Sequence, residues 1–415
     1  MSSDEETGDY LLLGKRYSLF QYESIGRYLS VPGKRNELTG QKPKRVNFIS
    51  IQSGHSVACT GYKQPMIRTG YEQVMGQRTT DMFCLSAKQD GEVISKSEKG
   101  IIVLHKDGTK KGIEIGRRFG SAGGVTYPHD IATTLNVGDK FKNGDILAYN
   151  TGFFEIDHYN KKNVIWKSNL LAKTVLWESN QTIEDASSIS MRLAEKLSMK
   201  TTKVKKIVVE FDKEVRNLVK AGQKLEPTTI LCTIEDSITS ASKLFDEESL
   251  NTLKMLSNQT PTSKVFGTVD KVEVFYHGDK EDMSQSLLEI SNLSDREMSR
   301  TFRSRGEPGF NGSVTDDFRI DGNPLLMDTM VINIYITSDV GTAVGDKGVF
   351  ANQMKTVFSE VMTKDMMTES GEIIDAVFGQ KSIEARVVCS PAIIGTTNTL
   401  LKVIASKAVK MFKES

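Results

Sequence analysis

The stretch Asn136-Val-Gly-Asp-Lys-Phe-Lys-Asn-Gly-Asp-Ile-Leu147 carries the pattern that decides the fold class. It is typical of a strand, a turn and a second strand, in which Gly138 and Gly144 supply the positive φ that two tight turns require. The stretch Leu218-Val-Lys-Ala-Gly-Gln-Lys-Leu-Glu-Pro-Thr-Thr-Ile-Leu231 repeats the pattern, with Pro227 in place of the second glycine. Two such stretches in one chain predict small β-barrel or sandwich-hybrid modules of related build.

Further strand signals lie on both sides of these two stretches. Residues 91–115 predict a hairpin or meander that turns at Asp107-Gly108. The nearly continuous run Val331-Ile-Asn-Ile-Tyr-Ile336 predicts a buried strand, because it is rich in β-branched residues. Residues 271–276 alternate apolar and charged side chains and end at a turn after His277. The fold class is therefore expected to be α+β and rich in strands.

Helices are expected at 186–198, 247–257, 351–363 and 397–413, where apolar residues recur at helical spacing. The last of these carries Leu400, Leu401 and Ile404 on one side and lysines elsewhere. This amphipathic pattern predicts a C-terminal docking helix whose apolar stripe packs on the core.

Composition divides the chain into four parts. Residues 1–45 are expected to form a tail and basic linker, 46–194 a first core segment, and 326–415 a second core segment. Polar and basic stretches mark 195–325 as a peripheral module, and we expect the two core segments to come together across it.

Charge and length exclude several classes of protein. The 415 residues hold 54 Lys and Arg against 53 Asp and Glu, so a chain that binds nucleic acid by bulk basicity is not expected. No apolar run approaches the roughly 18 residues that span a bilayer, and the acidic N-terminus does not predict a secretory signal. The four cysteines form no CxxC pair and the five histidines are scattered, which argues against a zinc ribbon or a metallohydrolase.

Ordinary enzyme signatures are missing from the sequence, and a small constellation remains. Gly120–Gly124 is glycine-rich but lacks the GK[ST] of a phosphate-binding loop, and no acidic cluster is able to hold two magnesium ions. Lys347 lies between glycines, Glu184-Asp185 are adjacent acids before a predicted helix, and Arg386 follows a polar loop. Singly, these residues fit a turn lysine, capping acids and a salt-bridged arginine. The glycines would equally let the backbone approach a bulky ligand while the Lys347 ammonium reaches a phosphate.

The order of the motifs gives these residues a shared context. From residue 60 onward the chain resembles the C-terminal part of the β subunit of multisubunit DNA-dependent RNA polymerases. Seven segments carry the resemblance in the family's order: Pro65–Glu72 (P-x-V-G-T-G-M-E), Asn136–Ala148 (V-x-x-G-D-x-x-x-x-G-D-x-L-A), Asn169–Ala186 (N-x-x-x-A, W and N-F-E-D-S), Leu218–Leu231 (G-x-x-x-x-x-G-D-I-L), Val265–Val274 (G-T-V-x-x-V-x-V), Asp316–Ile336, and Gly345–Val349 (G-N-K-G-V).

The resemblance implies a fold and a role for each candidate residue. It implies half of a double-ψ β-barrel core at 326–415, a fork and hybrid-barrel region at 46–194, and a small flap-like module at 195–325. Lys347 matches a lysine that contacts the RNA 3′ end or the α-phosphate; it fits either of two family lysines. Glu184 and Asp185 match the acidic pair near a second magnesium, and Arg386 matches an arginine that reaches the triphosphate. The stretch with Gln64, Arg68 and Glu72 would contact nucleic acid.

The resemblance also implies partners. The family's D-F-D-G-D motif, which holds the catalytic Mg²⁺, belongs to the β′ subunit and is absent here, as are the large N-terminal lobes and the C-terminal clamp-anchoring segment. The expected partners are β′-like subunits with D-x-D-G-D, an N-terminal β-like subunit, a promoter-specificity subunit, template DNA, RNA and nucleoside triphosphates, with no membrane. A split β chain of this size resembles those of giant tailed bacteriophages, which implies the cytoplasm of an infected bacterium or the virion as its location.

Two other functions remain open from the residues. A structural nucleic-acid-binding subunit would use the same folds without catalysis. A biotinyl or lipoyl carrier would use the glycine turns, but no lysine lies between two methionines at a hairpin tip.

Overall fold

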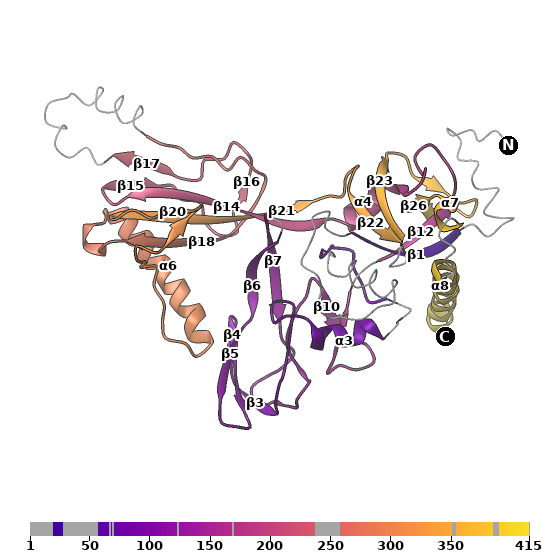
Figure 1. Cartoon of the computed structure of the whole chain (residues 1–415), viewed down its shortest axis with the longest axis horizontal. Helices are drawn as coiled ribbons and strands as arrows, with labels where there is room; N and C mark the ends of the chain where they lie inside the picture. Colours follow the sequence, from indigo (N-terminus) through magenta and orange to yellow (C-terminus); the bar gives the residue numbers. More distant parts are fainter. Residues whose placement is uncertain are drawn as a thin grey trace.

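The computed structural model describes residues 20–27, 57–65, 68, 70–122, 124–167, 170–236, 258–350, 354–384 and 390–414. Most of the elements are strands, which confirms the strand-rich α+β class. Three bodies radiate from a crossing of long strands in Figure 1: a barrel on the right, an arm on the left and a foot below. The barrel comprises 20–27, 170–198 and 341–384, the arm 199–236 and 258–340, and the foot 70–167.

The barrel closes from six strands that come from three distant parts of the chain. In order around the barrel, they are β1 (Phe20–Arg27), β12 (Leu170–Leu176), β26 (Ala376–Phe378), β13 (Ala186–Ser190), β23 (Met354–Met362) and β22 (Lys347–Phe350). The pairs β12–β26 and β13–β23 are parallel, and the other neighbours are antiparallel. Ile189, Phe350, Phe358 and Phe378 fill its core and are almost fully buried. Because β1 pairs with β12 and β22, part of the range expected to be a tail is a barrel strand.

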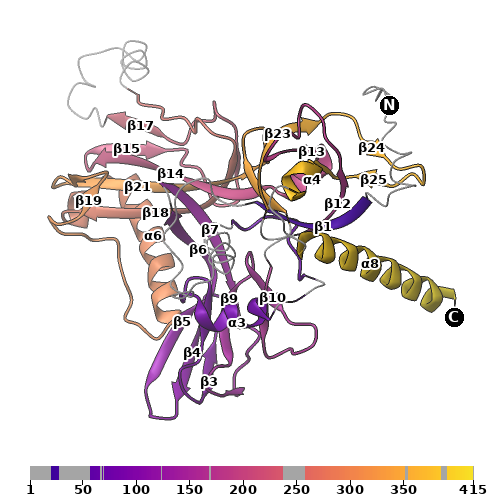
Figure 2. The same cartoon turned by 45° about the vertical axis from the view of Figure 1, so that its right-hand side comes forward.

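Short elements complete the barrel, and two of the expected helices need correction there. They are α4 (Met191–Lys196), β24 (Met366–Met367), β25 (Ile373–Ile374) and α7 (Gln380–Glu384), and the long helix α8 (Ser390–Glu414) follows the barrel. The apolar stripe of this helix, expected to pack on the core, mostly faces outward, and Figure 2 shows the helix pointing away from the body of the protein. The helix expected at 186–198 begins only at Met191, after Ser190 accepts a hydrogen bond from the N–H of Leu193. The helix expected at 351–363 is wrong, since Met354–Met362 is strand β23.

The spacing of the apolar residues explains the second error. Met354 and Phe358 are four residues apart, which fits a helix, but Met354, Thr356 and Phe358 are all buried with exposed or half-buried residues between them. That period of two places them on the inner face of a strand. The helix expected at 397–413 is confirmed within α8, and the helix expected at 247–257 lies outside the described residues.

The arm is built on three long antiparallel strands. β14 (Met199–Glu210) pairs along its whole length with β21 (Thr329–Val340), which pairs with β18 (Gly267–His277) and so confirms the strands expected at 331–336 and 271–276. Smaller elements flank them: β15 (Lys213–Arg216), β16 (Lys224–Leu225), β17 (Thr233–Asp236), the 3-10 helix η2 (Lys280–Asp282), α6 (Gln285–Ser304), β19 (Arg319–Ile320) and β20 (Asn323–Pro324).

The limits of the arm differ from those expected for the peripheral module. Met330, Ile332, Ile334 and Ile336 of β21 belong to the same buried cluster as β14 and β18. The boundary expected at 325 therefore falls before a strand that is part of the arm, which ends near Val340. The arm is inserted between α4 and β22, and barrel strands β13 and β23 pair across it.

The foot, residues 70–167, continues the arm's sheet. Its elements are α3 (Tyr71–Arg78), β2 (Cys84–Ser86), β3 (Gly91–Lys96), β4 (Gly100–His105), β5 (Lys110–Glu114), β6 (Gly116–Ala122), β7 (Val125–Ala132), β8 (Lys140–Phe141), β9 (Ile146–Asn150), β10 (Phe154–Ile156) and β11 (Val164–Trp166). β3, β4 and β5 confirm the meander expected at 91–115. β7 joins β14 through a single residue pair, Thr202 with Thr126.

The two related stretches share one local structure. Gly138 has φ 87°, and its N–H donates to the carbonyl of Val93, whose own N–H donates to the carbonyl of Asp139. In the second stretch Gly222 has φ 87°, and its N–H donates to the carbonyl of Val269, whose N–H donates to Gln223. In both copies a β-bulge follows the valine directly. The pattern predicted positive φ at the glycines, which is confirmed.

Candidate functional site

One end of the barrel brings Lys347 and the acidic pair into the same neighbourhood. Lys347, the first residue of β22, pairs with Val357 on β23. On the other edge of β23, Val357 pairs with Ala186, and its N–H donates to the carbonyl of Asp185 at 2.9 Å. Adjacent strands lie about 4.8 Å apart, so the backbones of Lys347 and Ala186 are about 10 Å apart. These residues come from opposite sides of the arm insertion.

The turn before Lys347 is fixed by backbone hydrogen bonds to β23. Gly345 has φ 92°, and its N–H donates to the carbonyl of Phe358 at 2.8 Å. In return, the N–H of Phe358 donates to the carbonyl of Asp346 at 2.8 Å. Asp346 Oδ2 also accepts the N–H of Ala343 at 2.9 Å. The Lys347 side chain, which follows this turn, is exposed.

The glycines around Lys347 have reasons within the barrel itself. A Cβ at Gly348 would lie 2.4 Å from the Phe358 ring, whereas Gly345 needs its positive φ for the turn. The sequence suggested that these glycines allow close approach of a ligand. The structure gives a packing reason and a turn reason instead.

Glu184 and Asp185 occupy the loop between β12 and β13, and both are exposed. The loop is ordered by Thr182, whose hydroxyl accepts the N–H of Ser179 and donates to the carbonyl of Trp177, both at 2.8 Å. Glu184 has φ 57°, and its carbonyl accepts a hydrogen bond from the hydroxyl of Ser382. The expectation that the pair precedes a helix is wrong, because strand β13 follows it.

Helix α7 is bonded to this acidic loop. The N–H of Lys381 donates to Glu178 Oε1 at 2.6 Å, and a Cβ at Gly379 would meet the Thr182 carbonyl at 2.5 Å. Gly379 is therefore required where α7 meets the loop. Arg386, the remaining residue expected at this site, lies outside the described residues.

The residues at this end of the barrel match only part of the coordination shell of a magnesium ion, so other groups would have to supply the remaining ligands. Mg²⁺ takes six oxygen ligands and is commonly held by one or two carboxylates together with waters and substrate phosphates. Two exposed carboxylates, those of Glu184 and Asp185, match that contribution. In the described part of the chain no three His, Cys, Asp or Glu side chains gather to hold a metal ion by themselves.

Gln64, Arg68 and Glu72 are not brought to the barrel end. Arg68 donates to Asp157 Oδ1 at 2.9 Å and to Gln64 Oε1 at 2.8 Å, and its guanidinium lies 4.8 Å from the centre of the Tyr159 ring. Burial raises the pKa of Asp157, but hydrogen bonds from Tyr159 and Arg68 outweigh burial and lower it. Glu72 is buried in α3. These contacts, and the hydrogen bond from Gln64 to the carbonyl of Ile156 at 2.6 Å, hold Gln64 and Arg68 against the β10–β11 hairpin of the foot.

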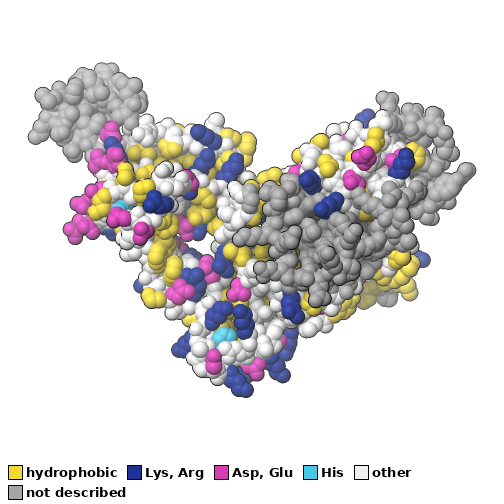
Figure 3. Space-filling model, in the orientation of Figure 1, with side chains coloured by type: hydrophobic (Ala, Val, Ile, Leu, Met, Phe, Trp, Pro, Cys, Tyr) yellow, Lys and Arg dark blue, Asp and Glu magenta, His cyan; other side chains and the backbone are white. Residues whose placement is uncertain are grey.

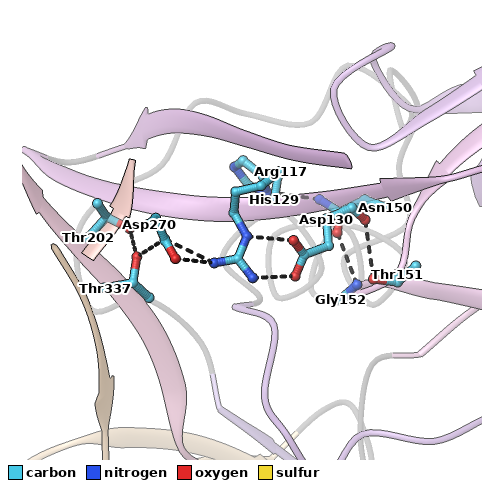
Figure 4. A network of polar contacts seen from close by, with 9 residues as sticks. All are labelled: Arg117, His129, Asp130, Asn150, Thr151, Gly152, Thr202, Asp270 and Thr337. Atoms are coloured by element: carbon cyan, nitrogen blue, oxygen red, sulfur yellow. Dashed lines mark hydrogen bonds and ion pairs between the residues drawn. The ribbon is translucent and has the colours of Figure 1, made fainter. Parts of the chain in front are cut away.

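A polar network that the sequence did not reveal joins the arm to the foot (Figure 4). Arg117 donates to both carboxylate oxygens of Asp130, at 2.5 and 3.0 Å, and to Asp270 at 2.9 and 3.1 Å. Asp270 also accepts the hydroxyl of Thr337 at 2.5 Å, and Thr337 shares a hydrogen bond of 2.6 Å with Thr202. Chiefly through its hydrogen bond with Asp130, the network raises the pKa of Arg117.

The β-bulge between Val269 and Lys271 explains why Asp270 serves the network. Asp270 is the extra residue of that bulge, and bulges re-aim a side chain away from its strand's regular face. The bulge lies next to the second glycine-turn stretch in space, because the N–H of Gly222 donates to the carbonyl of Val269. A second junction lies at the end of α6, where Arg305 donates to Glu114 at 2.9 Å and Lys99 to Glu297 at 2.6 Å. The arm and the foot are therefore connected at two separate junctions, and the two together are called the frame.

Comparison with known proteins identifies no family for this chain: no family model and no curated protein matches it.

Within the described residues, no helix has the length and apolar content needed to span a membrane. Acidic side chains gather at the far end of the arm, whereas basic and acidic side chains are interspersed elsewhere on the visible face (Figure 3). The functional assignment therefore depends on the residues and their geometry.

Proposed function

We propose that this chain is the C-terminal half of the β subunit of a virus-encoded, multisubunit DNA-directed RNA polymerase of the split type of giant tailed bacteriophages. The observation that carries the proposal is the convergence of Lys347 and the Glu184–Asp185 pair at one end of a closed barrel. The ordered motifs of the sequence supplied these residues, and strand pairing across the arm insertion brings their backbones together.

The barrel is proposed to be half of the double-ψ core of such an enzyme. Two parallel pairs, β12–β26 and β13–β23, support the proposal within a six-stranded closed sheet. Each of the segments 170–190 and 347–378 contributes strands to both pairs, so neither closes the barrel alone. The arm corresponds to the flap-like module and the foot to the fork and hybrid-barrel region.

The chemistry proposed for this end is positioning and charge stabilisation during nucleotide addition. Lys347 presents an ammonium to the RNA 3′ end or to the α-phosphate, where negative charge develops in the transition state. Glu184 and Asp185 orient waters or metal ligands beside the incoming triphosphate, which Arg386 contacts. Magnesium, held mainly by a β′-like partner with the D-x-D-G-D motif, neutralises charge on the reacting phosphates when bound.

The proposal requires other subunits. A β′-like chain supplies the metal site, a separate β-like chain supplies the N-terminal lobes, and a further subunit selects promoters. The isolated chain is expected to have no polymerase activity. The complex would act in the cytoplasm of the infected cell or be packaged in the virion.

A second candidate is a structural subunit that binds nucleic acid without catalysis. Its support is the Phe358 ring beside Gly348 and the backbone bonds of Gly345, which explain both glycines without a ligand. In this case the Lys347 charge would be dispensable for chemistry.

Substitution of Lys347 distinguishes the two candidates. In the complete complex, Lys347→Ala is expected to slow single-nucleotide addition about 100-fold or more, the usual effect of removing one transition-state contact. Lys364→Ala is the matched control, because Lys364 is also exposed but lies beyond the opposite end of β23. Normal assembly with equal rates for the two variants would favour the structural subunit.

A further inference from the structure

The backbone of Glu184 has the left-handed conformation, with φ 57°, which is unusual for a glutamate. In this conformation a Cβ crowds the neighbouring carbonyl, so glycine is the usual occupant, and Asn or Asp is tolerated because its short side chain bonds locally. Among the residues that the structure describes, none donates a hydrogen bond to the Glu184 carboxylate. The surroundings of Glu184 therefore have to impose its conformation on the backbone.

The two peptide groups that flank the Cα of Glu184 are both held by hydrogen bonds. On one side, the carbonyl of Ile183 accepts the N–H of Ala186 at 3.2 Å, a contact within the loop. On the other side, the carbonyl of Glu184 accepts the hydroxyl of Ser382, which belongs to helix α7. Because both neighbouring peptide groups are fixed, the direction of the Cα–Cβ bond between them is fixed as well.

Ser382 is itself held in place by the barrel. Its side chain is buried, and its N–H donates to the carbonyl of Gly379 at 3.2 Å, at the point where the chain comes closest to Thr182. The neighbouring N–H of Lys381 bonds Glu178 at the start of the same loop. Of these contacts between α7 and the loop, that of Ser382 reaches the acidic pair, whereas the others hold α7 against residues 178–182.

We propose that Ser382 is a positioning residue of the candidate site, whose hydroxyl holds the left-handed turn that directs the Glu184 carboxylate outward at the barrel end. The inference rests on the proposed function, in which Glu184 acts beside the incoming triphosphate. A carboxylate without a side-chain partner takes its direction from its own backbone. Loss of the Ser382 hydroxyl releases the peptide group after Glu184 and displaces the carboxylate, and a displacement of about 1 Å can slow a reaction about 100-fold.

A double-mutant cycle in the complete polymerase complex tests this role. Ser382→Ala is expected to slow single-nucleotide addition about 10- to 100-fold, and Ser382→Thr, which keeps the hydroxyl, should retain most of the rate. In a Glu184→Gln background, Ser382→Ala should change the rate by less than about 2-fold, because the carboxylate that it positions is gone.

The cycle separates failure of this proposal from failure of the proposed function. Equal slowing by Ser382→Ala in both backgrounds would overturn the positioning role, since Ser382 would then act without the Glu184 carboxylate. A normal rate in Glu184→Gln alone would contradict the proposed function, and the positioning role with it.

Amide hydrogen exchange gives a second readout that does not depend on nucleotide addition. In the same complex, Ser382→Ala should speed exchange of the Ala186 amide about 10-fold, as expected when a turn loses one hydrogen bond, and leave the amides of β23 unchanged. Ser263→Ala is the matched control, because Ser263 is a fully buried serine of the arm whose hydroxyl donates to the carbonyl of Val265 at 2.7 Å. It should alter neither nucleotide addition nor exchange at Ala186. Unchanged exchange at Ala186 in Ser382→Ala would show that the hydroxyl does not hold the turn and would overturn the proposal.

Discussion

A single methyl group at Gly348 tests whether the barrel's own packing dictates the sequence around Lys347. In Gly348→Ala the new Cβ would lie 2.4, 2.9 and 3.2 Å from three carbons of the Phe358 ring. Carbon atoms in contact prefer 3.5 to 4.0 Å, so the ring must move by about 1 Å. Phe358 is fully buried, and the tilted pair Phe350–Phe378 belongs to the same core. The displacement therefore has little room.

The expected cost is about 1 to 3 kcal/mol of unfolding free energy, the usual range for an extra group in a packed core. Gly341→Ala is the control, because a Cβ at Gly341 meets no atom within 4 Å, and its effect should stay within about 0.5 kcal/mol. Urea unfolding followed by Trp177 fluorescence in a Trp166→Phe background reports on the barrel, since Trp177 packs against barrel residues. Phe358→Leu, combined with Gly348→Ala in a double variant, should recover part of the lost unfolding free energy.

Equal stability of Gly348→Ala and Gly341→Ala would refute this reasoning. The ring would then have free space beside it, and the glycine would need a different explanation. Close approach of a ligand would become the better reason for Gly348.

Three further predictions concern the frame that carries the barrel. Asp270→Ala removes the hydrogen bonds from Arg117 and Thr337 and should lower the free energy of unfolding by about 2 kcal/mol, after allowance for partial exposure, with faster amide exchange in β7 and β14. The control Asp365→Ala, at an exposed side chain, should change neither the stability nor the exchange, and unchanged exchange in Asp270→Ala would contradict the proposed junction between arm and foot. Burial lowers the pKa of His129, so below about pH 6.5 the unfolded chain binds a proton that the folded chain does not, and the free energy of unfolding should fall as the pH drops. If the free energy of unfolding of His129→Gln falls with pH as steeply as that of the unchanged protein, this reasoning is refuted. Burial raises the pKa of Cys84 to about 12 and that of Cys232 to about 11. Iodoacetamide at pH 8 should therefore modify neither thiol until urea unfolds the chain, and labelling of either thiol in the native protein would contradict their burial.

Local turn chemistry was the most predictable part of the fold. Gly138 and Gly222 have the positive φ that their motifs require, because tight turns leave few alternatives. Strands 331–336 and 271–276 were also predictable from their side-chain patterns. Helix α6 was missed because polar serines face the core alongside Leu287 and Met298, which weakens its apolar stripe.

The arrangement of the site could not be predicted from the sequence, because it depends on the pairing of strands that are far apart along the chain. The motifs identified Lys347 and Glu184–Asp185, but only the pairing of β13, β23 and β22 places them around Val357. Arg68 illustrates the opposite case, since its sequence motif suggested nucleic-acid contact while its guanidinium bonds Asp157 and Gln64. Gln64 is 4 residues from Arg68 in the sequence, whereas Asp157 is 89 residues away, and a partner at that distance leaves no local pattern in the sequence.

The most direct test of the central claim is to locate the RNA 3′ end on the chain. The complete polymerase complex is loaded with RNA ending in 4-thiouridine, irradiated at long wavelength, and its adducts are mapped by peptide sequencing. The account predicts an adduct within residues 341–357, around Lys347, that disappears when the RNA is extended by several nucleotides. An adduct confined to the foot, or none in this chain while the partner subunits are labelled efficiently, would contradict it.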